Sequence, residues 1–281
     1  METISIIIPT MAGREELLEL LIKSIEGCVI HGGVRVQTVI VRDEDLLLAA
    51  KRNKGGCSAD GEWFLFIDDD NHLQEDAILH AIDVAQQPGI GIVGFMACYD
   101  DKSYLVADGG SKRNYLTGFT HGINTNAYYP TLPKKAYEVD EIANAFLMHC
   151  ELFFELHGFD EKKFPIDLDE ADFCKRVKNK GLKIMIAPAA RCFHRSQTYS
   201  HIPDFRRPLN AYFMGRNRVL YQRKHNSFVR YCLYVAFFCP VFVCFYSVSL
   251  LWRRKPKMIL HFLKGVFDGL LGRRENKYQK R

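Results

Sequence analysis

Several common signatures are missing from this sequence. Its nine cysteines form no CxxC pair, and their odd number fits free thiols in a reducing compartment better than a disulfide framework. No Asn-x-Ser/Thr sequon occurs, and no basic-then-apolar signal peptide precedes the first predicted strand. There is also no Walker A lysine motif. These absences argue against a secreted protein and a P-loop nucleotidase, and they predict a cytoplasmic catalytic domain.

Charge is divided unevenly along the chain. The net charge of +5 conceals a segment, residues 206–281, with 17 Lys and Arg against only Asp268 and Glu275. The remaining 21 basic and 31 acidic residues give residues 1–205 a net charge of −10. We therefore predict a catalytic domain over 1–205, suited to metal chemistry, and a basic region over 206–281, suited to an anionic surface.

Short β-branched runs alternate with helical stretches over the first hundred residues. Strands are predicted at 4–9, 34–41, 63–67 and 90–96, and helices at 15–26, 45–59 and 75–86. The apolar strands are typical of a mostly parallel sheet that is covered by helices on both faces. Residues 99–137 are rich in Gly, Asn, Pro and Tyr, and they predict loops with a short hairpin. The fold class is therefore α/β.

Three carboxylates, Asp68-Asp69-Asp70, directly follow the third predicted strand. Ligands of such sheets bind beyond the carboxyl ends of the strands, and adjacent carboxylates repel one another unless a cation neutralises them. Mg²⁺ or Mn²⁺ is the expected partner. The alternative is an acidic turn that caps the following helix near Glu75.

A second acidic cluster, Asp169-Glu170-Ala171-Asp172, opens a predicted helix that runs to Lys180, and His194 follows 24 residues after Glu170. On its own this cluster is typical of acidic residues that interact with a helix dipole. The order and spacing of Gly158-Phe159-Asp160-Glu161, the second acidic cluster, Ala187-Pro188 and His194 resemble family 2 glycosyltransferases of the GT-A fold, including rhamnosyl-, galactofuranosyl- and mannosyltransferases. The resemblance extends from Ser5-Ile6-Ile7-Ile8-Pro9-Thr10 to Arg216-Asn217-Arg218, about three quarters of the chain.

The resemblance implies a role for each matching position. Glu170 matches the family's general base, with Asp169 in reserve, because the family commonly has Asp at the Glu170 position. Asp70 and His194 match its metal site. The expected nucleotide-sugar contacts are Pro9, Thr10, Asp43, Arg52, Asp68 and Asp69, and the expected acceptor-side residues are Asp172 and Asn144. A second departure is Arg42, which stands where another Asp usually precedes Asp43.

Residues 231–252 form an uncharged stretch that is long enough to cross a bilayer as a helix. Basic residues flank it on both sides, so a single crossing would put one basic cluster on the wrong side of the membrane. A bend at Pro240 in a re-entrant or in-plane hairpin would keep both flanks on the cytoplasmic side. The sequence leaves transmembrane, re-entrant and in-plane arrangements open.

A last apolar pattern follows: Ile259, Phe262, Leu263, Val266, Phe267 and Leu270 share one side of a predicted amphipathic helix. The alternative to membrane binding is a helix packed on the protein's own core. Together with the basic flanks, this helix predicts association with anionic lipids at the cytoplasmic face of the cell membrane, and it argues against a nucleic-acid partner.

The expected activity is therefore inverting transfer of a sugar from a nucleotide-diphosphate donor to a lipid-linked saccharide or glycolipid. Two alternatives remain open at this point: a nucleotidyltransferase that makes the sugar nucleotide, and a non-catalytic sugar-binding subunit at the membrane.

Overall fold

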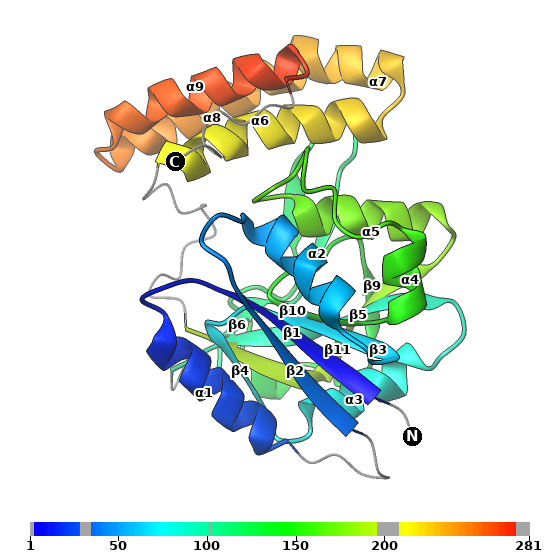
Figure 1. Cartoon of the computed structure of the whole chain (residues 1–281). Coiled ribbons are helices and arrows are strands. Elements are labelled where there is room, and N and C mark those ends of the chain that lie inside the picture. The colour runs from blue at the N-terminus through cyan, green and yellow to red at the C-terminus, as the bar shows by residue number, and fades with distance from the viewer. Residues whose placement is uncertain (1–2, 29–34, 102, 196–207, 274–281) are drawn as a thin grey trace. The chain divides into compact units, whose positions relative to one another are not determined.

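The computed structural model describes residues 3–28, 35–101, 103–195 and 208–273. They fall into two compact units (Figure 1). The first combines residues 1–112, 121–159 and 173–199, and the second combines 113–120, 160–172 and 200–281. Each unit is thus assembled from several segments, and the functional division at residue 205 stays a prediction.

A nine-stranded mixed sheet forms the centre of the first unit, in the order β2-β1-β3-β10-β5-β11-β4, with β6 pairing with β5 and β9 pairing with β11. The expected parallel core is present, because β1 (Thr3–Thr10) pairs in parallel with both β2 (Arg35–Arg42) and β3 (Trp63–Ile67). β5 and β11 also run parallel, and the other pairings are antiparallel. The remaining strands are β4 (Asn71–Leu73), β5 (Ile90–Tyr99), β6 (Val106–Asp108), β9 (Tyr137–Val139), β10 (Ala145–His149) and β11 (Lys183–His194).

Alternate side chains of each strand point to opposite faces of this sheet. Because both sets are apolar and buried, helices cover both faces. On one face, Ile4, Ile6 and Ile8 pack with the buried residues of α1 (Glu15–Glu26) and α3 (Ala77–Ala85). On the other face, Ile7, Phe64 and Phe66 pack with residues from three helices. These are α2 (Leu48–Ser58), α4 (Cys150–Glu155) and α5 (Asp169–Asn179). The hairpin predicted within 99–137 is present as β7 (Ser111–Arg113) and β8 (Thr120–Gly122), and a 3₁₀ turn follows at Tyr129–Thr131.

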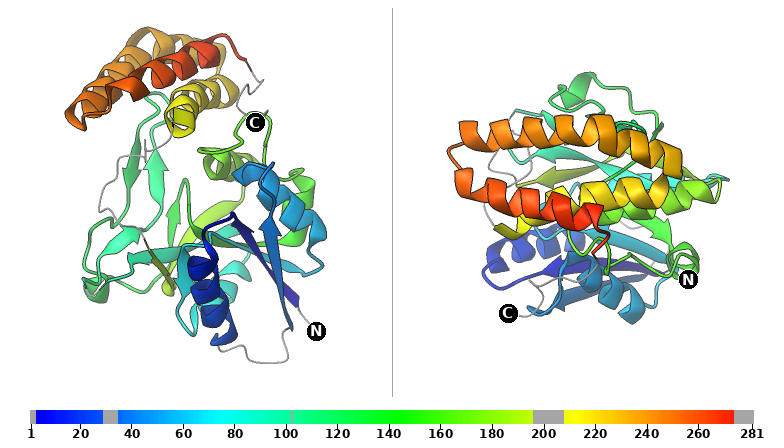
Figure 2. Two further views of the ribbon diagram at one scale, coloured as in Figure 1. Left: turned by 60° about the vertical axis from the view of Figure 1, so that its left-hand side comes forward. Right: turned by 90° about the horizontal axis from the view of Figure 1, so that it is seen from above.

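The second unit is built mainly from helices that lie alongside one another (Figure 2). They are α6 (Pro208–His225), α7 (Phe228–Leu233), a π-helical segment (Tyr234–Phe238), α8 (Cys239–Trp252) and α9 (Pro256–Leu270). From α7 through α8 the chain forms one helix of 25 residues. Among the described residues, this is the one helix that is long and apolar enough to cross a membrane.

The chain does not bend at Pro240, as the hairpin alternative would require. Proline lacks an N–H and its ring crowds the carbonyl one turn earlier, and here the π-helical segment just before Pro240 absorbs this conflict while the helix continues. The chain reverses instead after Trp252, where Arg254 adopts a φ of 56° and Pro256 begins α9.

Helices α6 and α9 approach closely through glycines. A Cβ on Gly265 would lie 2.0 Å from the Tyr212 carbonyl oxygen, and one on Gly215 would lie 2.4 Å from the Phe262 oxygen. The Asp268 carboxylate is buried at this contact, where it accepts a hydrogen bond of 3.1 Å from the Tyr212 hydroxyl. The predicted apolar stripe of α9 therefore divides. Phe262 and Val266 enter the core and Ile259 packs against it partly buried, while Leu263, Phe267 and Leu270 remain exposed.

We expect Gly265→Ala to destabilise the protein although alanine favours helices over glycine by about 1 kcal/mol. The new methyl group would collide with backbone atoms of α6, and such overpacking costs ~1–3 kcal/mol. Thermal unfolding followed by circular dichroism measures the effect. The matched control is Gly27→Ala, whose Cβ would find its nearest neighbour at 3.5 Å, so an equally large loss in this variant would contradict the explanation.

Candidate active site

The acidic triplet of the first unit lies where strand ends meet. Asp68, Asp69 and Asp70 follow β3 directly, and the Asp68 N–H donates to the Asn144 carbonyl at 3.0 Å. His194 ends β11, and the N–H of the next residue donates to the Asp70 carbonyl at 2.9 Å. Thr10 ends β1. The sheet thus brings together residues that are far apart in sequence.

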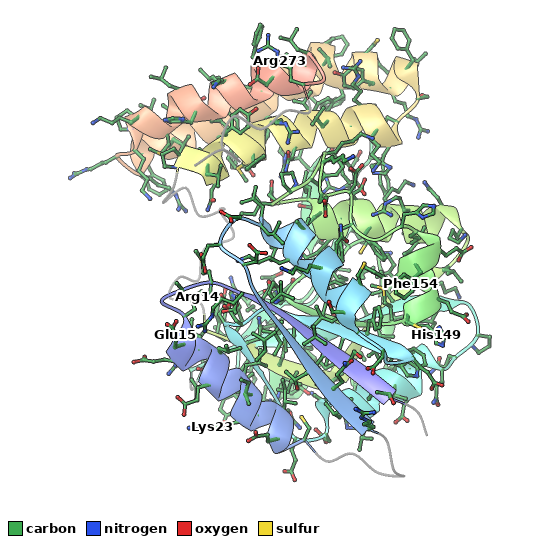
Figure 3. The ribbon with its side chains drawn as sticks, viewed as in Figure 1. Arg14, Glu15, Lys23, His149, Phe154 and Arg273 are labelled. Carbon is green, nitrogen blue, oxygen red and sulfur yellow. The ribbon has the colours of Figure 1, made fainter. Side chains whose placement is uncertain are left out.

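Arg14 neutralises two of the three carboxylates. It precedes α1 (Figure 3), and its guanidinium lies 2.8 Å from an Asp69 oxygen and 2.7 Å from an Asp70 oxygen. The Thr10 hydroxyl donates to the other Asp69 oxygen at 2.6 Å. Sequence reasoning missed Arg14 because a single arginine between a strand and a helix carries no pattern.

The two carboxylates ionise very differently. Asp69 is only 3% exposed, and burial raises its pKa to about 6 against the pull of Thr10 and Arg14. Burial would also raise the pKa of Asp70, but His194 and Arg14 outweigh it and lower that pKa to about 2. Asp70 is therefore anionic at neutral pH, whereas the buried Asp69 takes up a proton at a higher pH than Asp70 does.

Asp70 and His194 come together as the sequence predicts. The His194 Nε2 lies 3.5 Å from an Asp70 oxygen. Burial alone would lower the pKa of His194, but the hydrogen bond and charge of Asp70 raise it overall. This contact joins a carboxylate and an imidazole, and both are partly exposed. Their role as metal ligands stays a prediction.

The donor set fits a cation that arrives with a phosphate ligand. Within the described ranges, no group of three or more His, Cys, Asp and Glu side chains has the arrangement of a metal cage. Mg²⁺ characteristically binds through one or two carboxylates, with phosphate oxygens and water completing its shell. Mn²⁺ also accepts carboxylate ligands. Asp70 and His194 supply one oxygen and one nitrogen donor for such an ion.

Arg52 makes contact with Asp68. It is 1% exposed, and its guanidinium donates to an Asp68 oxygen at 2.8 Å while lying 5.7 Å from the centre of the Phe159 ring. Arg52 therefore orients Asp68. Its expected direct contact with a nucleotide stays a prediction.

Asp108 is a second residue that the sequence did not reveal. It ends β6 and accepts hydrogen bonds from the Gly110 N–H at 2.7 Å and from the Asn144 amide at 3.3 Å. Burial raises the pKa of Asp108, and the charge of His194 opposes that rise. The expected acceptor-side residue Asn144, with a left-handed φ of 67°, thus links Asp108 to the backbone of Asp68.

The expected nucleotide contacts near β1 and β2 differ in exposure. Pro9 is buried inside β1, where it is in register with Val41. Asp43 follows β2 and is partly exposed, and the Lys54 ammonium donates to it at 2.8 Å, which lowers the pKa of Asp43. Asp43 can therefore accept hydrogen bonds as an anion.

The second acidic cluster belongs to the second unit as far as Asp172. Asp172 is fully buried, 2.6 Å from the Lys224 ammonium and 2.8 Å from the His225 ring, and these contacts favour a structural role. Asp169 is also buried, whereas Glu170 is half-buried. Glu170 is therefore the more accessible of the two candidate bases. The role of Glu170 as the general base stays a prediction.

Comparison with known proteins shows what the chain is similar to. No family model and no curated protein sequence matches it. A solved structure of GalNAc-T7 with UDP, GalNAc and Mn²⁺ aligns with a TM-score of 0.56 at 12% identity, over 69% of this chain and 44% of that one. The chain thus spans less than half the length of GalNAc-T7.

Two other solved structures align over more of their length. A Pyrobaculum calidifontis mannosyltransferase with GDP-Man and Mn²⁺ gives a TM-score of 0.55 at 12% identity, over 96% of this chain and 87% of that one. The catalytic domain of Drosophila β1,4-galactosyltransferase 7 with xylobiose gives 0.51 at 15% identity, over 81% and 82%. These likenesses confirm the GT-A fold expected from the sequence.

We expect Arg14→Ala to lower the melting temperature more at pH 8 than at pH 4.5. The folded-state pKa of Asp69, about 6, exceeds its ordinary value of 3.8, so stability falls as pH rises through this window. Without Arg14 the pKa of Asp69 would rise further, and stability would fall more as the pH rises. Asp70, with its pKa of about 2, loses its partner equally at both pH values.

Thermal melts at the two pH values provide the measurement. Arg42→Ala is the control, because Arg42 is exposed and lies 3.5 Å from Glu15, and such a surface pair contributes about 0–1 kcal/mol. An Arg14→Ala effect that is independent of pH would show that Arg14 does not hold the ionised form of Asp69.

Proposed function

We propose that this chain is an inverting, metal-dependent glycosyltransferase of the family 2 type, which moves a sugar from a nucleotide-diphosphate donor to a membrane-linked acceptor. The observation that carries this proposal is the meeting of Asp68, Asp70 and His194 at the strand ends of a GT-A sheet. Ligands of α/β sheets bind at this edge. Two structures with the same fold were solved with Mn²⁺ and a nucleotide or nucleotide sugar, which supports a similar donor here.

The donor-side roles follow from charge and exposure. Asp43 accepts from the nucleotide base, and Asp68, oriented by Arg52, accepts from the ribose or contacts the metal. Asp70 and His194 would hold Mg²⁺ or Mn²⁺. The ion, when bound, would neutralise the diphosphate as it leaves. Thr10 holds Asp69 in place through a buried hydrogen bond, and this contact helps to fix the position of the three carboxylates.

On the acceptor side, Glu170 is the general base. Its carboxylate takes the proton of the acceptor hydroxyl, and the oxygen attacks the anomeric carbon from the face opposite the diphosphate. The new glycosidic bond forms as the bond to the diphosphate breaks, which inverts the anomeric centre and releases a nucleoside diphosphate. The greater exposure of Glu170 than of Asp169 supports this choice.

The helical unit would hold the enzyme at the cytoplasmic face of the cell membrane. Its long apolar helix and its exposed arginines support contact with anionic lipids. A lipid-linked saccharide or glycolipid is the acceptor class that such a location would offer.

Release of nucleoside diphosphate from a panel of UDP-, GDP- and dTDP-sugars, with Mn²⁺, with Mg²⁺ or with EDTA, tests the proposal. We expect metal-dependent release that is stimulated by a membrane lipid extract. Glu170→Gln should reduce turnover roughly a hundred- to ten-thousand-fold, because general-base catalysis contributes that much. Asp70→Asn should abolish the metal dependence together with the activity.

The control is Asp76→Asn, an exposed carboxylate that pairs with His80 at 3.1 Å on α3, and it should retain full activity. Formation of sugar nucleotide from a nucleoside triphosphate and a sugar phosphate would replace the proposal with nucleotidyl transfer. If Asp70→Asn and Glu170→Gln both left function intact, a non-catalytic sugar-binding role would replace it.

A further inference from the structure

We propose that the helices α6, α7–α8 and α9 lie in the plane of a membrane surface and that the helix Phe228–Trp252 does not cross the bilayer. The occupant of the exposed apolar surface is the interfacial layer of a bilayer with anionic headgroups. This inference rests on the proposed membrane association and adds the orientation, which the sequence leaves open.

A row of exposed side chains without charge runs along α7–α8. Its main members are Phe237, Val241, Phe245, Val248 and Trp252, which recur every three or four residues and so share one side of the helix. Phe237 is 64% exposed and Trp252 is 84% exposed. Large exposed apolar surfaces of this kind mark contact with a membrane or a partner. We call these five residues the α8 row.

The opposite side of the same helix is occupied by protein. Tyr234, Phe242, Tyr246 and Leu250 are buried in a cluster with residues of α6 and α9. On α9 an equivalent division exists, because Phe262 and Val266 are buried while Leu260, Leu263 and Phe267 are exposed. Both helices thus have an inner side packed on protein and an outer side free to meet lipid.

A partly buried arginine argues against a crossing. The Arg218 guanidinium of α6 lies 4.8 Å from the centre of the Phe242 ring and 5.7 Å from that of Tyr246. Both rings belong to the middle turns of the helix Phe228–Trp252. If this helix crossed the bilayer, Arg218 would lie near the bilayer centre, where an arginine is strongly unfavourable.

The neighbouring helix α9 is also unsuited to a crossing. Its 15 residues span about 22 Å, which is less than the ~30 Å of hydrocarbon. It carries an exposed Lys264 within its length and buries the Asp268 carboxylate against Tyr212. Since α9 is packed against α6 through glycine contacts, it would accompany the bundle into the membrane with these charges.

The distribution of exposed cations fits one leaflet. Arg230 lies near the start of the long helix, and Arg253, Arg254 and Lys257 lie just beyond its end, all exposed. A crossing would place these two groups on opposite sides of the membrane. An in-plane helix brings both groups to the same anionic headgroups, where each cation strengthens binding. Trp252 is then at the depth that tryptophan prefers.

Depth-dependent fluorescence quenching tests the orientation. The chain has two tryptophans, so Trp63→Phe leaves Trp252 as a single reporter, and adding Trp252→Phe with Val241→Trp moves the reporter to the middle of the helix. Both full-length variants are bound to vesicles of phosphatidylcholine and phosphatidylglycerol that contain lipids brominated at shallow or deep positions.

An in-plane helix predicts that the reporters at 241 and 252 lie at the same shallow depth, about 5–10 Å into the headgroup and acyl boundary. A crossing predicts a difference of about 16 Å, because 11 residues of helix separate the two positions. Deep quenching at 241 with shallow quenching at 252 would overturn the proposal.

Substitutions in the α8 row test whether this row contacts the membrane. The double variant Phe237→Glu and Phe245→Glu should lose at least tenfold in vesicle affinity without a change in folding, since both side chains are exposed. Leu20→Glu, at an exposed leucine of α1, is the matched control and should bind as the parent does.

Failure of the unaltered chain to bind the vesicles would overturn this inference, and so would self-association through the α8 row, seen as a dimer that the double variant abolishes. Release of nucleoside diphosphate, measured in parallel without vesicles, separates such a failure from failure of the proposed reaction.

Discussion

The candidate site depends on the placement of positive charge around three consecutive carboxylates. Each carboxylate that follows β3 has its own partner: Arg52 donates to Asp68, Arg14 bridges the next two, and His194 approaches Asp70 from β11. Because these partners come from separate elements, the site exists only when those elements have come together. The charge balance of the site therefore depends on the folding of the whole first unit.

Much of the sheet could be predicted because burial on both faces leaves a strong local pattern. Helix α1 and strand β3 have the predicted bounds, and the parallel core follows from continuous apolar runs. Strand β10 was missed, because its five residues follow an aperiodic segment and its antiparallel pairing with β3 and β5 depends on partners far away in sequence. The pairing of distant strands has no local signature.

The site was predictable in part for the same reason. The carboxylates could be placed at a strand end from the local pattern, whereas His194 was assigned beside Asp70 through the resemblance to family 2 glycosyltransferases, and the structure brings the two side chains together. Arg14 and Asp108 could not be placed, because their roles come from tertiary contacts with Asp69 and Asn144. The sequence also left open whether the chain bends at Pro240, and in the structure a π-helical segment accommodates this proline within a continuing helix.

The two acidic clusters look alike in sequence but differ in what neutralises them. Asp172 is fully buried between the Lys224 ammonium and the His225 ring, so its carboxylate has no face left for a ligand. Asp70 keeps a quarter of its side chain exposed, remains ionised, and has a partly exposed arginine, Arg14, among its partners. A divalent cation can compete with a partly exposed guanidinium more readily than with a buried ion pair, because the displaced charge returns to water. Exposure of the counterion, more than the number of carboxylates, therefore decides which acidic cluster can exchange its protein partner for a metal and a diphosphate.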